Sequence, residues 1–137
     1  MSKKVIKVAA GVIFDRKQRL LACERPAGKA LAGKWDFPGG KLEPGETAAQ
    51  ALQRELREEL AIEVTVLDEM YRLTVDTPDN KMLVLHFLRA LLKDGSEPVA
   101  CEDQRFCWVK KSELFKIDWL DTDKEFVEYL AAAYGRE

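Results

Sequence analysis

The sequence has few of the residues that form disulfides or bind metals through sulfur and nitrogen. Its 137 residues include three cysteines and one histidine. Cys23, Cys101 and Cys107 are odd in number and lack the short spacing of a zinc site, which excludes a disulfide framework. We interpret them as reduced thiols of a cytoplasmic protein. The lone histidine, His86, lies in a strand-like segment and is more typical of a packed residue than of a catalyst.

Long apolar runs and an excess of one charge are also missing. The first apolar stretch begins at Val5, is interrupted by Lys7 and ends before Asp15, so it predicts neither a secretory signal nor a membrane span. The 22 basic and 24 acidic residues leave a net charge of −2, without the basic stripe typical of stable nucleic-acid binding. We expect a single domain, residues 1–137, that is cytoplasmic, a monomer or homodimer, and without membrane contact.

Apolar periodicity predicts strands on both sides of a central helix. The strand-like segments are residues 5–14, 19–25, 35–37, 63–75, 81–92 and 105–109. Thr47 and Gln50 form a capping-box pattern that opens a helix ending at Leu60. A second helix is expected from Thr122, with Gly135 as its C-terminal cap. The order β-β-β-α-β-β-β-α favours an α/β fold of the α+β type, a mixed sheet sandwiched between helices.

The central helix carries three carboxylates beside its apolar stripe. The stripe recurs every fourth residue and comprises Ala48, Leu52, Leu56 and Leu60. At about 100° per residue, Glu55, Glu58 and Glu59 cluster at its edge. Like charges at this spacing repel by about 0.2–0.5 kcal/mol per pair in water and more when partly buried. A solvated charged face is one interpretation. The other is a site for Mg²⁺, which takes its ligands from carboxylates and substrate phosphates.

A longer pattern surrounds these carboxylates and favours the metal site. Gly40 is followed after five residues by Glu46, and after seven more by the sequence RELREEL. This block resembles the Nudix signature, in which an arginine and four glutamates follow a glycine at these spacings. Ala61 stands where the signature has its last glycine, at a left-handed helix end that costs another residue about 1–2 kcal/mol. The resemblance implies a Nudix fold, and the departure at Ala61 concerns the helix end rather than the metal site.

Nearly the whole chain is similar to the MutT and CTP pyrophosphohydrolase branch of this family. The sequence WDFPGGK, residues 35–41, matches the branch's WEFPGGK with aspartate in place of glutamate. Glu102 falls where the branch carries a glutamate near the metal or the attacking water, although a loop glutamate can also be merely solvated. Asp123 falls where the branch contacts the base edge, although aspartate is also favoured near a helix N-terminus. The resemblance implies substrate contacts from Arg25, Trp35, Asp36, Phe37, Pro38, Gly39, Lys41 and Asp123.

The chemistry implied by the resemblance is hydrolysis of a nucleoside triphosphate to a monophosphate and pyrophosphate. The implied cofactor is Mg²⁺, with Mn²⁺ as an alternative ion. The implied metal ligands are Gly39, Gly40, Glu55, Glu58, Glu59 and Glu102. Arg54 would hold the glutamates through charge-assisted hydrogen bonds, supported by Glu46. The general base is Glu55 or Glu102, and the sequence does not choose between them.

The preferred base depends on how Asp123 is protonated. An ionised carboxylate only accepts hydrogen bonds, which favours an amine edge such as cytosine N4, whereas a buried and protonated one could also bind 8-oxoguanine. The WDFPGGK segment favours oxidised guanine nucleotides, so we expect sanitation of 8-oxo-dGTP, with hydrolysis of CTP or 5-methyl-dCTP next. ADP-ribose and dinucleoside polyphosphates are further alternatives. Non-catalytic Nudix modules usually lose the glutamates that this chain keeps, and nothing in the sequence supports a prenyl diphosphate isomerase.

Overall fold

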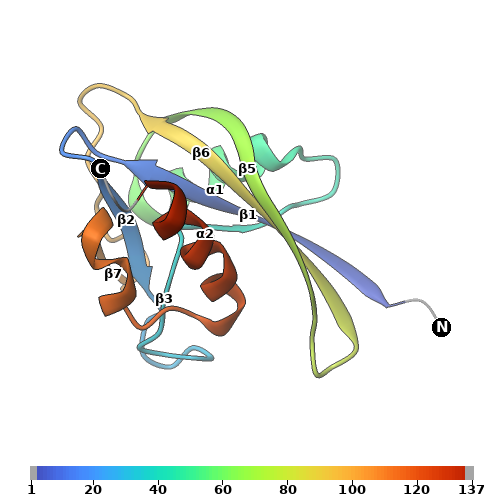
Figure 1. Cartoon of the computed structure of the whole chain (residues 1–137). Helices are drawn as coiled ribbons and strands as arrows, with labels where there is room; N and C mark the ends of the chain where they lie inside the picture. Colours follow the sequence, from blue (N-terminus) through green and yellow to red (C-terminus); the bar gives the residue numbers. More distant parts are fainter. Residues whose placement is uncertain (1–2, 135–137) are drawn as a thin grey trace.

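The computed structural model describes residues 3–134, so the predicted cap Gly135 lies outside the described part of the chain. The elements are β1 (Lys4–Phe14), β2 (Arg19–Glu24), β3 (Trp35–Asp36), β4 (Gly39–Lys41), α1 (Ala48–Leu60), β5 (Val64–Asp76), β6 (Lys81–Leu92), β7 (Arg105–Lys110) and α2 (Lys124–Tyr134), with short 3₁₀ helices at Lys111–Lys116 and Asp121–Asp123. Figure 1 shows the strands as a twisted sheet with α1 and α2 on opposite sides. No helix among residues 3–134 is long and apolar enough to cross a membrane.

The sheet is mixed, as the sequence predicts. Its strands follow the order β3-β2-β1-β6-β5, with β4 also paired to β1 and β7 to β2. β1 runs parallel to β6 along its whole length, while the other pairs are antiparallel. The short strand β4 is missing from the sequence prediction. It forms because Gly39 and Gly40 pair with Ala10 and Ala9 of β1, which fastens the glycine pair to the centre of the sheet.

Alternate residues of β1 pack against different helices, which confirms the predicted sandwich. Ala10 and Val12 belong to a core cluster that includes Phe126 of α2. Ala9 and Ile13 belong to a second cluster that includes the leucines of the α1 stripe. Each fully buried leucine or isoleucine contributes about 1.5–3 kcal/mol through removal from water. The sheet is therefore a rigid support with a buried core on both faces.

The two ends of α1 follow from their local sequence. Thr47 caps the helix and forms the predicted reciprocal capping box with Gln50. At the other end, Ala61 takes the left-handed conformation, with φ 54° and ψ 35°. Its N–H donates to the Arg57 carbonyl, the single hydrogen bond of the αL type of helix ending, and the N–H of Ile62 donates to the Leu56 carbonyl. Ala61 thus ends the helix in the conformation for which the signature uses glycine, and it bears the steric cost.

The second helix begins two residues later than predicted. Thr122 is not its cap, because residues 121–123 form a 3₁₀ turn and α2 begins at Lys124. The N–H of Asp123 closes this turn on the Leu120 carbonyl, and the Leu120 N–H donates to the carbonyl of Trp35 in β3. The contact with β3 therefore holds the segment in a tight turn and sets the position of Asp123.

Candidate active site

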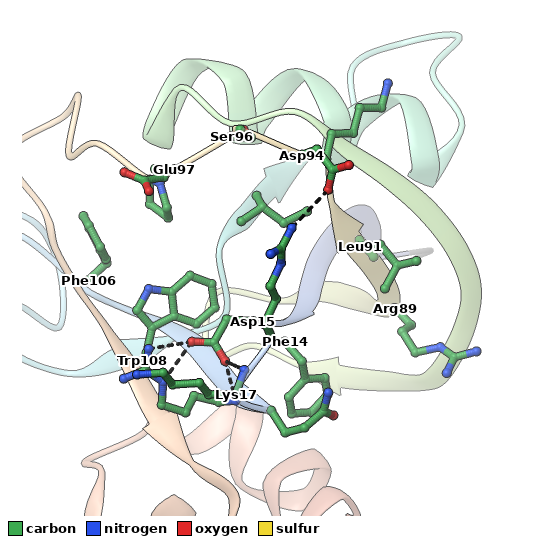
Figure 2. A pocket seen from close by; sticks show the side chains of 18 residues that line it. Phe14, Asp15, Lys17, Arg89, Leu91, Asp94, Ser96, Glu97, Phe106 and Trp108 are labelled. Atoms are coloured by element: carbon green, nitrogen blue, oxygen red, sulfur yellow. Dashed lines mark hydrogen bonds and ion pairs between the residues drawn. The ribbon is translucent and has the colours of Figure 1, made fainter.

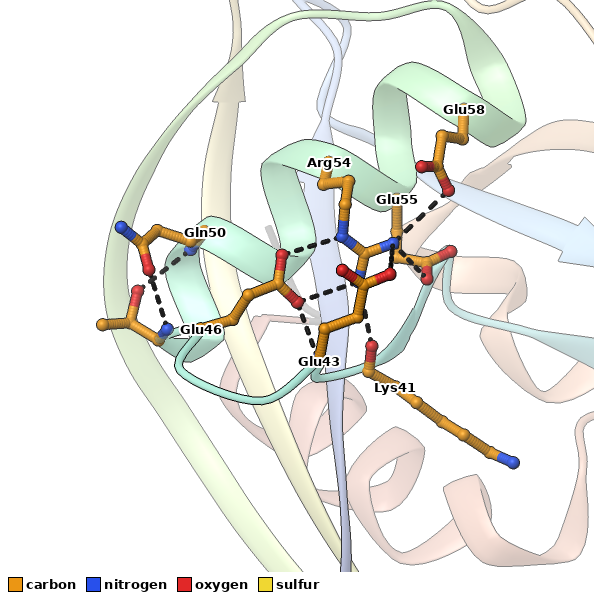
Figure 3. Close-up of polar contacts among 8 residues, drawn as sticks. Lys41, Glu43, Glu46, Gln50, Arg54, Glu55 and Glu58 are labelled. Atoms are coloured by element: carbon orange, nitrogen blue, oxygen red, sulfur yellow. Dashed lines mark hydrogen bonds and ion pairs between the residues drawn. The ribbon is translucent and has the colours of Figure 1, made fainter.

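Arg54 lies at the centre of a polar network on α1 (Figure 3). Its Nε and Nη2 atoms donate to the two oxygens of Glu46 at 2.7 and 2.9 Å. Nη1 donates to Glu55 at 2.9 Å and reaches Glu58 at 3.4 Å, while Nη2 also donates to the Lys41 carbonyl at 3.0 Å. The hydrogen bonds from Arg54 are the main reason that the pKa of Glu46 is lowered to about 2. One guanidinium therefore joins the loop before α1 to two of the predicted carboxylates.

Glu59 turns away from Arg54 and towards the glycine pair. The N–H of Gly39 donates to its Oε2 atom at 3.2 Å. Burial raises the pKa of Glu59 to about 8, with further contributions from the negative charges of Glu55, Asp36 and Glu102. The hydrogen bond from Gly39 opposes this rise but does not cancel it. Folding thus holds a half-buried carboxyl among other acids, an arrangement that a nearby cation would relieve.

The glycine pair is required by close packing at both positions. Gly39 has φ 148°, and a Cβ atom there would lie 1.9 Å from the carbonyl oxygen of Ala9. At Gly40 a Cβ atom would lie 2.4–2.6 Å from the carboxyl atoms of Glu55. The absence of both side chains therefore lets the Glu55 carboxylate lie directly against the backbone of β4.

A pocket of about 150 Å³ opens beside Glu59, at the end of α1. The predicted site residues that line it are Arg25, Asp36, Phe37, Pro38, Gly39, Glu59 and Glu102. It is also lined by Cys23, Glu24, Pro26, Lys29 and Gln104, which sequence reasoning missed. The sequence did carry a signal for Gln104, because this residue stands two positions after the predicted site residue Glu102. The other four carried no pattern of their own.

Several predicted site residues lie outside the lining of this pocket. Glu58 has a side chain that is 54% exposed and faces Arg54. Lys41 is exposed, and the structure uses its carbonyl rather than its ammonium group to bind Arg54. Trp35 is half-buried in β3.

Phe37 lines the pocket, but its ring packs in the core. The ring stacks on Trp119, with centroids 4.9 Å apart, so a ligand in the pocket would meet mainly the backbone of Phe37.

Two further carboxyl groups lie close together where the base is expected. Burial raises the pKa of Asp36 to about 6, although the Arg25 guanidinium, 3.5 Å away, opposes the shift. Burial, together with the charge of Asp36, raises the pKa of Asp123 to about 7. Asp123 is buried and is absent from the pocket lining. Near neutral pH it therefore exists in both protonated and ionised forms, so it can donate or accept a hydrogen bond.

The donor set suits a hard divalent cation. Within residues 3–134, no three acidic, histidine or cysteine side chains converge as a closed metal site in their present positions, since Arg54 holds Glu55 and Gly39 holds Glu59. Glu102 is nevertheless near the other two acids, and its negative charge helps to raise the pKa of both Glu55 and Glu59. Carboxylate and backbone carbonyl oxygens are the ligands that Mg²⁺ and related ions prefer. The cluster therefore fits the predicted cofactor in its chemistry.

A larger groove than the one beside Glu59 lies elsewhere on the molecule (Figure 2). Its volume is about 990 Å³, and it lies between the β1–β2 turn and the loop after β6, with Phe106 and Trp108 among its lining residues. An ion pair of 3.6 Å joins Arg16 and Asp94 beside it. None of the predicted site residues lines this groove. The carboxyl groups with raised pKa values therefore identify the candidate active site better than the volume of a groove does.

Comparison with known proteins assigns the chain to a family. Residues 5–130 match the NUDIX domain. An 8-oxo-dGTP diphosphatase of Haemophilus influenzae is 37% identical over 116 residues, which cover 83% of this chain and 82% of that protein. A CTP pyrophosphohydrolase of Escherichia coli is 54% identical over 63 residues, 46% of each chain. The solution structure of the E. coli ORF135 protein has a TM-score of 0.81 at 34% identity and covers 98% of this chain and 94% of its own.

The chain belongs to the Nudix family and is a Nudix hydrolase with the fold of the MutT-like members. Hydrolases of this family generally use divalent cations, in agreement with the oxygen donors beside Gly39. The predicted fold and the predicted family are both confirmed.

Proposed function

We propose that this protein hydrolyses 8-oxo-dGTP to the monophosphate and pyrophosphate with Mg²⁺, and so removes an oxidised nucleotide from the precursors of DNA. The observation that carries the proposal is Glu59, a half-buried carboxyl with a pKa of about 8 beside Glu55 and Glu102. Such a cluster at the edge of a pocket is suited to a metal ion and the phosphates that bind it. The relative from Haemophilus influenzae, named as an 8-oxo-dGTP diphosphatase, supports this substrate.

Bound Mg²⁺ would neutralise charge on the phosphates and lower the pKa of a water molecule for attack on phosphorus. In this proposal its ligands are Gly39 or Gly40 and the glutamates of the cluster, namely Glu55, Glu58, Glu59 and Glu102. Arg54 orients Glu55 and Glu58 through the contacts described above. Glu102 takes the proton of the attacking water, because it lines the pocket while Glu55 is held by Arg54 beneath Gly40.

Base selection belongs in this proposal to Asp123, together with Asp36 and Arg25. A protonated Asp123 donates to O6 of 8-oxoguanine, and an ionised one accepts from the N7–H of that base. Its pKa of about 7 makes both forms accessible at neutral pH. A CTP-type substrate is the second candidate, supported by the E. coli CTP pyrophosphohydrolase and by the amine edge that an ionised Asp123 would prefer.

The test is a screen of pyrophosphate release with Mg²⁺ from 8-oxo-dGTP, dGTP, CTP and 5-methyl-dCTP, with ADP-ribose hydrolysis followed separately. The proposal expects the highest kcat/KM for 8-oxo-dGTP. A higher value for CTP or 5-methyl-dCTP selects the second candidate, and no turnover of any triphosphate refutes both. Asp123→Asn keeps a donor and an acceptor at every pH, so it should raise the preference for 8-oxo-dGTP over the cytosine nucleotides. An unchanged preference refutes the base-selecting role of Asp123.

A further inference from the structure

The segment that carries Glu102 is fastened to the C-terminal end of α1. The N–H of Val99 donates to the Leu60 carbonyl at 2.8 Å, and the N–H of Cys101 donates to the Glu59 carbonyl at 3.0 Å. Carbonyls in the last turn of a helix have no partner within the helix, so they are free to bind a neighbouring segment. The segment is thus attached to the backbone of the same residue whose carboxyl borders the pocket.

Gln104 adds a side-chain bridge to this attachment. Its Nε2 atom donates to the Glu59 carbonyl at 3.1 Å, and its Oε1 atom accepts from the N–H of Glu102 at 3.0 Å. The side chain is buried, with 7% of the residue exposed. The amide nitrogen therefore binds the backbone of Glu59, and the amide oxygen binds the backbone of Glu102. Both of these glutamates line the pocket.

The bridge also spans a tight turn. Asp103, between Glu102 and Gln104, has φ 61°, a left-handed conformation that aspartate adopts more readily than most residues other than glycine. The hydrogen bond from Glu102 N–H to the Gln104 amide closes the turn over Asp103 and fixes its geometry.

We propose that Gln104 is a positioning residue, which holds the Glu102 carboxylate in register with Glu59 for hydrolysis. This inference rests on the proposed function and assigns a role to a residue that never needs to contact the substrate. Glutamine suits the position because it supplies a donor and an acceptor at the required reach. Leucine of similar size supplies neither, and an ionised glutamate keeps the acceptor but loses the donor to Glu59.

The experiment is a double-mutant cycle on pyrophosphate release from the best substrate, with kcat and KM measured for the wild type, Gln104→Leu, Glu102→Gln and the double variant. Misplacement of a reacting group by about 1 Å can cost on the order of 100-fold in rate. We expect Gln104→Leu to lower kcat about 10- to 100-fold with KM within about threefold. In the Glu102→Gln background, the same substitution should cost less than about twofold, because its effect passes through Glu102.

Two further variants separate positioning from loss of stability. Ser96→Ala removes the hydrogen bond of 2.8 Å from Glu63 N–H to Ser96 Oγ, which anchors the preceding loop away from the carboxylates. It should lower the melting temperature and leave kcat unchanged. Gln104→Glu keeps the size and the acceptor, so it provides the same comparison if the leucine variant does not fold, with an expected loss in kcat of about tenfold.

The outcomes are distinct from those of the proposed function. No turnover by the wild type refutes the proposed function itself. Normal turnover by the wild type with unchanged kcat in folded Gln104→Leu or Gln104→Glu overturns the positioning role. An equal loss from the Gln104 substitution with and without Glu102 also overturns it, since the effect would then not pass through that glutamate.

Discussion

Gly39 donates its N–H to the carboxylate of Glu59, and this hydrogen bond of 3.2 Å joins β4 to the end of α1. Glycine is required there because a Cβ atom would collide with the Ala9 carbonyl of β1. The next residue, Gly40, leaves the space that the Glu55 carboxylate occupies. The glycine pair and the glutamates of the signature are therefore parts of one local structure, held on the central strand of the sheet.

Arg54→Lys should lower kcat about 10- to 100-fold while the protein stays folded. A lysine ammonium cannot reproduce the planar fork that binds Glu46 through two atoms and also reaches Glu55, so both carboxylates lose their common anchor. Steady-state kinetics with circular dichroism as the check on folding measures this. Arg57→Lys is the matched control, because Arg57 pairs with Glu63 at the surface and its substitution should leave kcat unchanged. Equal kinetics for the two variants would show that Arg54 has no orienting role.

Asp123→Asn should stabilise the protein by an amount that grows between pH 5 and pH 8. The pKa of Asp123 rises from 3.8 to about 7 on folding, so the folded state binds more protons than the unfolded state across this interval. The contribution of Asp123 to the free energy of unfolding therefore falls as pH rises, by at most about 1.4 kcal/mol per pH unit. Asparagine does not titrate, so the Asp123→Asn variant does not lose stability in this way. Thermal or urea unfolding of both proteins at several pH values measures the difference.

The control for this titration is Asp121→Asn. Asp121 is exposed, and its hydrogen bond with Lys124 lowers its pKa below 3.8. A group with a lowered pKa loses its contribution only as pH falls through that acidic range, so the effect of Asp121→Asn should be constant from pH 5 to pH 8. A constant effect of Asp123→Asn over the same range would contradict the raised pKa of the buried carboxyl.

Ala61→Gly should raise the free energy of unfolding by about 1 kcal/mol. Ala61 has φ 54°, where glycine avoids a steric cost of about 1–2 kcal/mol and loses part of that gain to its greater freedom when unfolded. Ala132→Gly, at an exposed position inside α2, should instead lower the free energy of unfolding by about 1 kcal/mol. Urea denaturation of the wild type and the two variants measures both changes in the free energy of unfolding. Destabilisation by Ala61→Gly would mean that the left-handed helix end carries no strain.

Much of the fold was predictable because its local signals agree. The capping box at Thr47 and the four-residue stripe of α1 correctly placed the central helix. The short strand β4 was not predictable, since two glycines and a lysine have no strand periodicity and pair with β1 only in the tertiary structure. The start of α2 was missed for a related reason. The pattern at Thr122 favours a cap, but the contact of Leu120 with Trp35 imposes a 3₁₀ turn.

The site was predictable where the signature is dense and less so outside it. The resemblance to the signature implied that Glu55 and Glu59 share a site with Gly39 and Gly40, and in the structure both glutamates lie beside this glycine pair. Lys29 and Cys23 reach the pocket because β2 and the loop after it fold beside the end of α1, a relation that no local spacing encodes. The hydrogen bond from Gln104 to the Glu59 carbonyl likewise joins residues 45 positions apart. Which residues share the pocket thus depends on topology more than on motif.

The central claim is that the glutamates of α1 bind a divalent cation that the reaction requires. Its most direct test is pyrophosphate release from 8-oxo-dGTP as a function of Mg²⁺ concentration, for the wild type and Glu59→Gln, with Glu63→Gln as a surface control. Glutamine has nearly the shape of glutamate but is a neutral and poorer ligand, so Glu59→Gln should remain folded and lose on the order of 100-fold or more in kcat. The account predicts saturable Mg²⁺ dependence in the wild type and the control, with no turnover in chelator. Wild-type rates in Glu59→Gln, or turnover of the wild type in chelator, would contradict it.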